Sequence, residues 1–374
     1  MNNKPLLPFL ASDRRSFLKN TIAGASGLAL GSLAFGGCAK AEEETPTAET
    51  SEPNYRKMRE VLYSGPSNVS LYASTDQREA SYKALKPLQS EIEQAIGDKQ
   101  VVLKLNLTQT KLKNYKGATD TNFSRGILDF LSEFYDRPII IGESCPNPME
   151  GFTNYGYTDF LKEYNVKLVD LNNEGTTKMW IHDALYNPGP IQIVNTYLDP
   201  NVYMISATRF KTHDSTIATL SYKNIALGAP YGVRPPKGGR PQKALMHPRG
   251  AKRGKIHAYN MFRLATYGIH PDLAVLDGIR GMEGNGPNNG EVVEGKIALA
   301  SQDWVAADRI GVELMGFNYE EMKWLQFCSA AGMGNDDIAQ MNLIGANYND
   351  YIQSYRHHDQ IDSQREWLHE DFGM

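Results

Sequence analysis

Residues 202–232 read VYMISATRFKTHDSTIATLSYKNIALGAPYG, and this stretch decides the fold. It begins with the apolar run 202–205, which is typical of a strand buried on both faces of a sheet. Arg209, Lys211 and His213 then follow within five residues. The sequence therefore predicts a central strand that carries cationic and titratable side chains to its carboxyl end.

A strong positive charge surrounds this stretch. Residues 207–255 contain 11 Lys or Arg and one acidic residue, Asp214, so this window is formally +10 in a chain of net charge −4. Local positive potential attracts negative partners whatever the net charge of the chain. The window therefore predicts an anionic ligand. We expect a small molecule or a glycan rather than nucleic acid, because the export signal described below takes the protein away from nucleic acid.

The N-terminus has the features of a targeting segment. Residues 12–19, SDRRSFLK, resemble the twin-arginine export signal, and no charge occurs between residues 21 and 38. The alternative is a basic start to a core helix. We expect residues 1–38 to be a twin-arginine signal peptide. The twin-arginine translocase would recognise this peptide and export the protein. We therefore expect a bacterial protein that is exported to the periplasm or to the outer side of a membrane.

Cys38 stands where signal cleavage would leave an N-terminal cysteine. The preceding residues, LAFGG at 33–37, resemble a lipobox, so acylation of Cys38 would anchor the chain to a membrane. An ordinary cleavage site with an incidental cysteine is the alternative. Residues 39–54 carry five Glu, two Pro and no Leu, Ile, Val or aromatic residue. They predict an acidic, disordered linker.

The whole chain has 374 residues, of which 41% are hydrophobic, and is long enough to bury a full core. We expect one α/β domain over residues 55–374, with its core at 100–345. Only Cys145 and Cys328 remain after the predicted signal peptide, which excludes a framework of disulfides and an iron–sulfur cluster held by cysteines of this chain alone.

Strand and helix patterns alternate along this domain. Strands are expected at 101–107, 138–142, 166–171, 202–205, 273–276 and 296–300, and helices at 75–97 (with a boundary at Pro87), 121–135, 157–163, 256–267, 303–315 and 320–331. Short apolar strands between helices predict an α/β fold with a mainly parallel sheet, helices on both faces and Rossmann-like layering. A long basic loop, 233–255, is inserted.

Polar residues follow nearly every predicted strand. Ligands of open parallel sheets bind beyond the carboxyl ends of the strands, so we expect these residues to share one edge. They are Lys104, Asn106, Glu143, Ser144, Asp170, Asn172, Arg209, Lys211, His213, Asp277 and Asp303.

Several of these segments resemble one family. The matching segments are VVLKLNL at 101–107, IIIGES at 139–144, FKTH at 210–213, SYKN at 221–224, LDGIRGMEGNGPNNG at 276–290 and ASQDWVAAD at 300–308. Together they resemble the bacterial and archaeal family called domain of unknown function 362. The resemblance implies an α/β domain. Members of that family often carry ferredoxin-like cysteine motifs, which this chain lacks.

Lys211, His213 and Asp277 are the candidate catalytic residues. Alternation along an extended segment puts Lys211 and His213 on the same face. A lysine near an imidazole lowers the pKa of both, which suits proton transfer near neutral pH. The alternative is a solvated pair at a strand end. Asp277 would orient these groups.

The candidate substrate-binding residues are Lys104, Asn106, Arg209, Lys223, Asn224, Gly284 and Asn285. If 215–224 is helical, its hydroxyl-rich start could hold an anion with backbone N–H groups, and Lys223 would add a cation. The alternative is an N-cap and a solvated lysine. The glycine-rich loop 281–287 lacks the Lys-Ser/Thr of a P-loop; it either lets backbone approach a ligand or forms an ordinary turn.

A divalent metal is a further possibility. Glu143, Asp277 and Asp303 carry the ligand types of a hard or borderline ion, but no HExxH or paired-histidine spacing supports such a site.

These residues predict an exported enzyme that acts on an anionic substrate, bearing carboxylate, phosphate or sulfate, by lysine and histidine acid–base chemistry. Its reaction class, whether hydrolase, isomerase or lyase, stays open. The alternative is a non-catalytic, membrane-tethered binding protein for anionic ligands or glycans.

Overall fold

Strand β7 (Val202–His213) lies at the middle of the sheet, and all twelve of its residues are buried. The computed structural model describes residues 59–107, 110–233, 241–247 and 253–370, which belong to the unit Met58–Met374. The predicted signal peptide, Cys38 and the acidic linker lie outside these residues.

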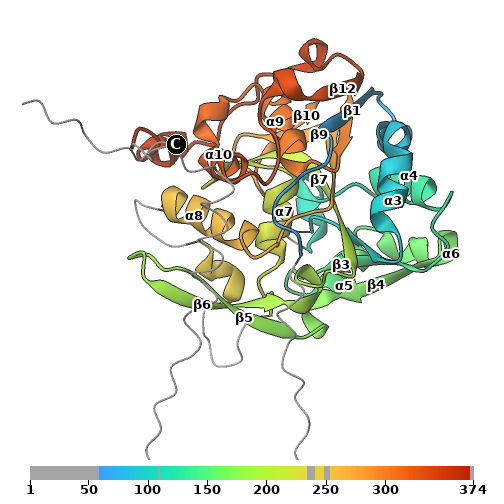
Figure 1. Ribbon diagram of the computed structural model, residues 1–374, viewed down its shortest axis with the longest axis horizontal. Helices are drawn as coiled ribbons and strands as arrows, with labels where there is room; N and C mark the ends of the chain where they lie inside the picture. The colour runs from blue at the N-terminus through green and yellow to red at the C-terminus, as the bar shows by residue number, and fades with distance from the viewer. Residues whose placement is uncertain (1–58, 108–109, 234–240, 248–252, 371–374) are drawn as a thin grey trace, which may run out of the picture. The chain divides into compact units, whose positions relative to one another are not determined.

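The central sheet has the strand order β12-β1-β11-β9-β7-β2-β3-β4 (Figure 1). Five consecutive members, β9, β7, β2, β3 and β4, run parallel to one another. Two further strands, β8 and β10, pair with the carboxyl-terminal parts of β7 and β9. The bounds are β1 Asn68–Ala73, β2 Gln100–Lys104, β3 Ile139–Glu143, β4 Val166–Asp170, β8 Ile217–Thr219, β9 Leu273–Glu283, β10 Glu291–Glu294, β11 Ile297–Ser301 and β12 Asn342–Gly345.

The direction of β11 differs from the prediction. It pairs antiparallel with both β9 and β1, so its carboxyl end lies at the opposite edge of the sheet from those of β2, β3 and β7. All five of its residues are buried. A continuously buried run shows that a strand is covered on both faces, but it does not show which way the strand runs.

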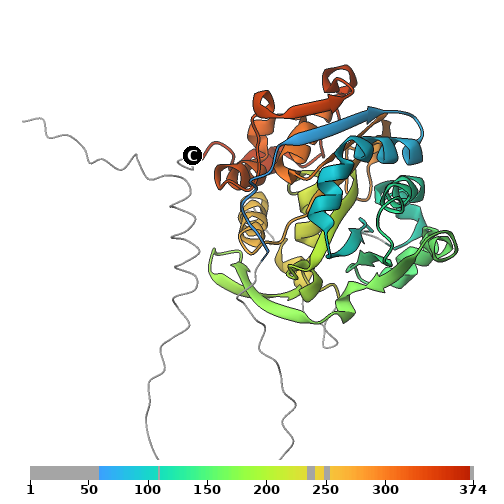
Figure 2. The same ribbon diagram turned by 45° about the vertical axis from the view of Figure 1, so that its right-hand side comes forward.

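Helices cover both faces of the sheet, as predicted (Figures 1 and 2). Alternate residues of β7 belong to two separate cores, because successive side chains of a strand point to opposite faces. Tyr203 and Ile205 pack in the core that includes residues of α2, α3 and α4, whereas Met204 packs in the core of α7, α8, α9 and α10. The helices are α2 Gln77–Leu85, α3 Gln89–Ile96, α4 Thr121–Leu131, α5 Pro148–Asn154, α6 Phe160–Glu163, α7 Ser221–Gly228, α8 Arg253–Ala265, α9 Trp304–Leu314, α10 Lys323–Ala330 and α11 Ile361–Arg365.

Several local features refine the predicted elements. Pro87 lies in a short 3₁₀ turn that separates α2 from α3. Strands β5 (Thr176–His182) and β6 (Pro188–Val194) form a two-stranded sheet that the sequence did not predict. The segment 215–224 is not one helix, because β8 occupies 217–219 and α7 begins only at Ser221. Among the described residues, no helix has both the length and the apolar character needed to cross a membrane.

Candidate functional site

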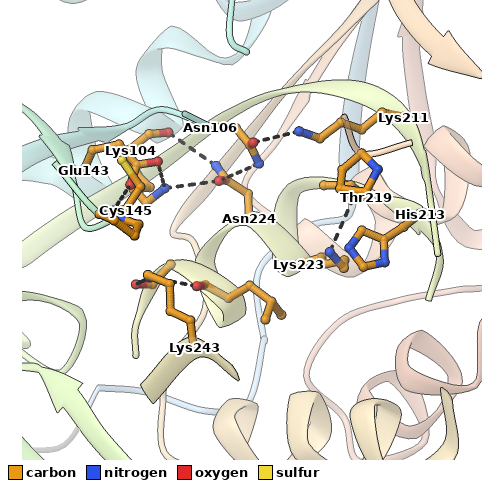
Figure 3. A pocket seen from close by; sticks show the side chains of 14 residues that line it. Lys104, Asn106, Glu143, Cys145, Lys211, His213, Thr219, Lys223, Asn224 and Lys243 are labelled. Carbon is orange, nitrogen blue, oxygen red and sulfur yellow. Dashed lines mark hydrogen bonds and ion pairs between the residues drawn. The ribbon is translucent and has the colours of Figure 1, made fainter. Parts of the chain in front are cut away.

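A cavity of about 90 Å³ lies beyond the carboxyl ends of β2 and β3 and beside the end of β7. This is where open parallel sheets bind ligands, and its volume holds several water molecules or one small polar group. The lining residues are Lys104, Asn106, Glu143, Cys145, Pro146, Lys211, His213, Thr219, Lys223, Asn224, Leu227, Gly228, Lys243 and Pro287. In Figure 3, Lys104, Glu143 and Cys145 lie on one side, Lys211, Lys223 and His213 on the other, and Asn106 and Asn224 between them.

Lys104 and Glu143 form a buried ion pair at the ends of two neighbouring strands. The Nζ of Lys104 lies 2.7 Å from Oε1 of Glu143, and each side chain is at most 4% exposed. Backbone N–H groups of Leu107, Ser144 and Cys145 also donate to the Glu143 carboxylate. Burial alone would raise the pKa of Glu143, but the charges of Lys104 and Lys243 and these hydrogen bonds hold it below its usual value. Glu143 is therefore ionised.

Two asparagines connect this pair to Lys211. The Nζ of Lys211 donates to Oδ1 of Asn106 at 2.7 Å and to the carbonyl of Gly117 at 2.8 Å. Asn106 donates through Nδ2 to Oδ1 of Asn224 at 3.0 Å, and the Nζ of Lys104 donates to the same oxygen at 3.2 Å. Burial, followed by the charge of Lys223, lowers the pKa of Lys211 well below the usual value of a lysine.

Lys223 lies in the first turn of α7 and is 5% exposed. The first N–H groups of this helix are not available to an anion, because Ser221 and Tyr222 donate theirs to Asp308 at 2.8 and 3.0 Å. The segment 215–224 is not one helix, so the condition under which its hydroxyl-rich start was expected to hold an anion is not met. The Nζ of Lys223 lies 3.5 Å from Oγ1 of Thr219. Burial lowers the pKa of Lys223 to about 7.

Lys243 reaches the cavity from the described part of the basic loop. It belongs to the short 3₁₀ turn Gln242–Leu245. Its Nζ donates to the carbonyls of Gly228 at 2.6 Å and Leu227 at 2.9 Å, at the end of α7. Burial lowers the pKa of Lys243 to about 7, although Glu143 acts in the opposite direction.

His213 is held as a neutral ring. The backbone N–H of Ser215 lies 3.1 Å from Nδ1 of His213, and Oδ1 of Asp214 lies 3.1 Å from the same ring nitrogen. Burial, followed by the charge of Lys223, places the pKa of His213 well below its ordinary value. The Oγ of Ser215 also lies 3.1 Å from this Nδ1 and 3.0 Å from Nδ1 of His257, and the His247 ring stacks on that of His213.

Charge is unbalanced at the cavity. Four amino groups, of Lys104, Lys211, Lys223 and Lys243, line it together with a single carboxylate, that of Glu143. Lys104, Lys211 and Lys223 are buried and Lys243 is half-buried, and the pKa values of Lys211, Lys223 and Lys243 are lowered as a result. A negatively charged ligand would relieve the mutual repulsion of these groups.

Arg209 and Asp277 do not line the cavity. They are register partners on β7 and β9, and Nε of Arg209 lies 3.4 Å from Oδ2 of Asp277. The same carboxylate accepts a hydrogen bond from Gln77 of α2 at 2.9 Å, and Arg209 pairs with Asp120, the N-cap of α4, at 3.0 Å. These residues therefore tie the sheet to the helices on one face.

Gly284 and Asn285, which were predicted to bind substrate, also do not line the cavity. The Gly284 carbonyl accepts a hydrogen bond from Thr212, and the amide of Asn285 pairs with Asp359 at 2.7 Å. From the glycine-rich loop only Pro287 lines the cavity.

The three predicted metal ligands are not gathered at one place. Asp303 caps α9 and binds Ser67 at 2.7 Å, at the edge to which the reversed strand β11 leads. Glu143 pairs with Lys104 and Asp277 with Arg209. Within the part of the chain that the structure describes, no three His, Cys, Asp or Glu residues are arranged to hold a metal ion.

The sequence did not single out Lys243, Cys145 or Thr219 as lining residues. Lys243 belongs to the basic loop 233–255. The positive charge of that loop does not indicate which of its lysines and arginines lines the cavity. Cys145 follows Glu143 by two residues at the end of β3, so extension of the strand-end argument by one residue would have found it. Thr219 could be identified only once β8 was known to turn back along β7.

Two comparisons with known proteins bear on identity. The chain is 24% identical over 220 residues to the Thylakoid-associated protein sll1697 of Synechocystis sp. (strain ATCC 27184 / PCC 6803 / Kazusa), an alignment that covers 59% of this chain. The chain spans 63% of the length of that relative. The profile of a family described as Domain of unknown function (DUF362) matches residues 101–313, more than half of the chain and a range that contains the whole lining of the cavity. The chain therefore belongs to the DUF362 family.

Proposed function

We propose that this protein is an exported enzyme that binds a small anionic substrate in the cavity and transfers protons to or from it. The observation that carries the proposal is that four amino groups, three of them buried, converge on a cavity whose described lining includes one carboxylate. Burial of cations is costly unless opposite charge accompanies them. The described lining supplies the carboxylate of Glu143, so we assign further negative charge to the substrate.

The binding groups would be Lys104, Lys211 and Lys243, with the amides of Asn106 and Asn224. Hydrogen bonds within the protein hold these lysines in place before any ligand arrives. Binding therefore costs little ordering of side chains. The cavity admits a small molecule or one terminal group of a larger one.

The proton-transfer groups would be Lys223 and His213. A pKa of about 7 lets Lys223 act as acid or base at neutral pH. The neutral ring of His213 would assist Lys223 by a hydrogen bond to a substrate oxygen. Asp277 has no part in this proposal, because it lies in the contacts to α2 and α4.

Export is supported by the resemblance of residues 12–19 to a twin-arginine signal. The name of the cyanobacterial relative, which describes it as thylakoid-associated, supports a membrane-associated or exported location. We include in the proposal recognition by the twin-arginine translocase and acylation of Cys38 as a membrane anchor.

Calorimetric titration with inorganic sulfate tests the site, because the charge of sulfate is constant over the neutral range. We expect one sulfate per chain at pH 7 and at least tenfold weaker binding by Lys211→Met. The matched control is Lys167→Met, on the exposed side of β4, which should bind as the wild type does. Equal binding by all three proteins would contradict the proposal.

A binding protein without catalysis is the second candidate. The prearranged contacts of Lys104 and Lys211 favour it, because they form a receptor that needs no moving group. His213→Ala separates the two functions. A receptor would keep its ligand affinity and its biological function in this variant, whereas an enzyme would lose turnover with its melting temperature near that of the wild type.

A further inference from the structure

Lys223 differs from the other three lysines of the cavity in its contacts. Lys104, Lys211 and Lys243 each donate hydrogen bonds of 2.8 Å or less to oxygen atoms of the protein. For Lys223, the contact within hydrogen-bond range among the described residues is the one to Thr219, and it measures 3.5 Å. The amine is 5% exposed and lines the cavity. It is thus a buried amine that the surrounding protein scarcely holds.

The surroundings of Lys223 favour its neutral form. Burial lowers the pKa of this lysine, the carboxylate of Asp214 opposes that shift, and the positive charge of Arg253 adds to it. Its pKa of about 7 agrees with that geometry. A neutral amine has a free electron pair and is a nucleophile toward carbonyl carbon, and desolvation next to cationic groups is one known way to activate a lysine for this reaction.

The neighbouring groups define which carbonyl compounds would enter. The amino groups of Lys211 and Lys104 and the amide of Asn224 lie around the cavity, as Figure 3 shows, and an anionic group in the cavity would lie close to these amino groups. A volume of about 90 Å³ limits the ligand to a few heavy atoms. A carbonyl adjacent to a carboxylate would place its carbon close to the anion-binding groups and thus within the same small space as the amine.

We propose that Lys223 forms a Schiff base with a small anionic aldehyde or ketone of the 2-oxo acid type. This inference rests on the proposed function, since it takes the anion-binding site as given. The electron pair of Nζ forms a bond to the carbonyl carbon, and the carbon–oxygen π electrons move to oxygen, which takes up a proton. The carbinolamine nitrogen then expels water as the second C–N bond forms, and the sum is amine plus carbonyl giving imine plus water.

His213 and Thr219 have positioning roles in this step. The ring of His213 lines the cavity, where its N–H can hydrogen-bond the carbonyl oxygen as negative charge develops there. The Oγ1 of Thr219 lies beside the amine and directs it.

Trapping with sodium cyanoborohydride tests the proposal. The full chain is incubated at pH 7.5 with glyoxylate or pyruvate, reduced, and analysed by intact mass and peptide mapping. We expect one reduced adduct per chain, located on Lys223. Lys223→Met should form no adduct. Lys223→Arg should also form none, although it keeps a positive charge at this position. The control Lys167→Met should form the adduct as the wild type does. Lys211→Met should lower the yield at least tenfold at limiting glyoxylate, and acetaldehyde, which has no carboxylate, should react at least tenfold less than glyoxylate.

The sulfate titration on the same samples separates this inference from the proposed function. Normal sulfate binding without an adduct on Lys223 would overturn the Schiff base and leave the anion site standing. Absence of both would overturn both. Adducts spread over surface lysines, or equal yields from acetaldehyde and glyoxylate, would also overturn it. Melting temperatures of the variants within a few degrees of the wild type show that a lost adduct does not reflect unfolding.

Discussion

Two buried polar clusters lie along β7, and they differ in how far their charged groups are paired with groups of opposite charge. In the first cluster, Arg209 lies between Asp277 and Asp120, and Gln77 and backbone N–H groups complete the contacts of the two carboxylates. In the second, the cavity cluster, Glu143 is the one carboxylate among four lysines. The first cluster is complete without a ligand, whereas the second is not. The comparison teaches that unmet charge, rather than burial of charge, distinguishes a binding site from a structural ion pair.

The largest effect is expected from Asp277→Asn. The substitution leaves the Arg209 guanidinium buried with one fewer opposite charge, and loss of one partner of a buried pair costs about 3 kcal/mol of unfolding free energy. Sulfate affinity should not change. The matched control is Asp129→Asn, which breaks the more exposed pair with Arg78 and should cost less than about 1 kcal/mol. Denaturant unfolding and calorimetry measure the two quantities. Weakened sulfate binding with unchanged stability would show that Asp277 belongs to the site after all.

The next effect concerns pH and Lys223. Its folded pKa of about 7 lies below the ordinary lysine value of 10.5, so between these values the unfolded chain binds the proton and the folded chain does not. Wild-type stability should therefore rise with pH across this window, by up to about 1.4 kcal/mol per pH unit for this lysine. Lys223→Met removes that slope, so its advantage over the wild type is greatest at pH 7 and shrinks toward pH 9.5. Parallel stability profiles for the two proteins would refute the lowered pKa.

The smallest effect is on ligand binding by the cavity cluster. Bound sulfate should raise the lowered pKa values of Lys223 and Lys243, so the protein takes up protons as it binds. Sulfate affinity should then fall between pH 7 and 9, by up to about tenfold per pH unit for each lysine that takes up a proton. Titrations in buffers of different ionisation enthalpy measure the uptake directly. Binding heats that do not depend on the buffer would mean that no proton is taken up.

The fold class follows from the sequence because apolar runs and helical spacing are local patterns. The strands at Val202, Gln100 and Ile139 and the helices between them were recognisable, and the mainly parallel sheet is confirmed. The direction of β11 was not recognisable, since its buried residues would look the same in either direction. The β5–β6 hairpin was missed because its Gly- and Pro-containing second strand lacks a strong strand pattern.

The candidate site was predictable as far as strand ends determine it. Lys104, Glu143, Lys211 and His213 meet because β2, β3 and β7 end at one edge. Asp303 does not join them, since it follows the reversed strand. Asp277 and Arg209 lie within β9 and β7, which do end at this edge, but their side chains lie in the contacts to α2 and α4. Which side of the sheet each side chain occupies depends on register and on the bulge between Arg209 and Lys211, neither of which a single sequence determines.

Cys145 has a consequence for how the molecule can be observed. Its thiol lines the cavity but is 5% exposed, and burial, followed by the charge of Glu143, raises its pKa. Few thiolates exist at neutral pH, and alkylating reagents attack the thiolate. The rate at which iodoacetamide labels this cysteine therefore reports how often the end of β3 opens to solvent. A ligand in the cavity should slow the labelling of Cys145. The labelling rate of the unmodified protein would then report whether the cavity is occupied.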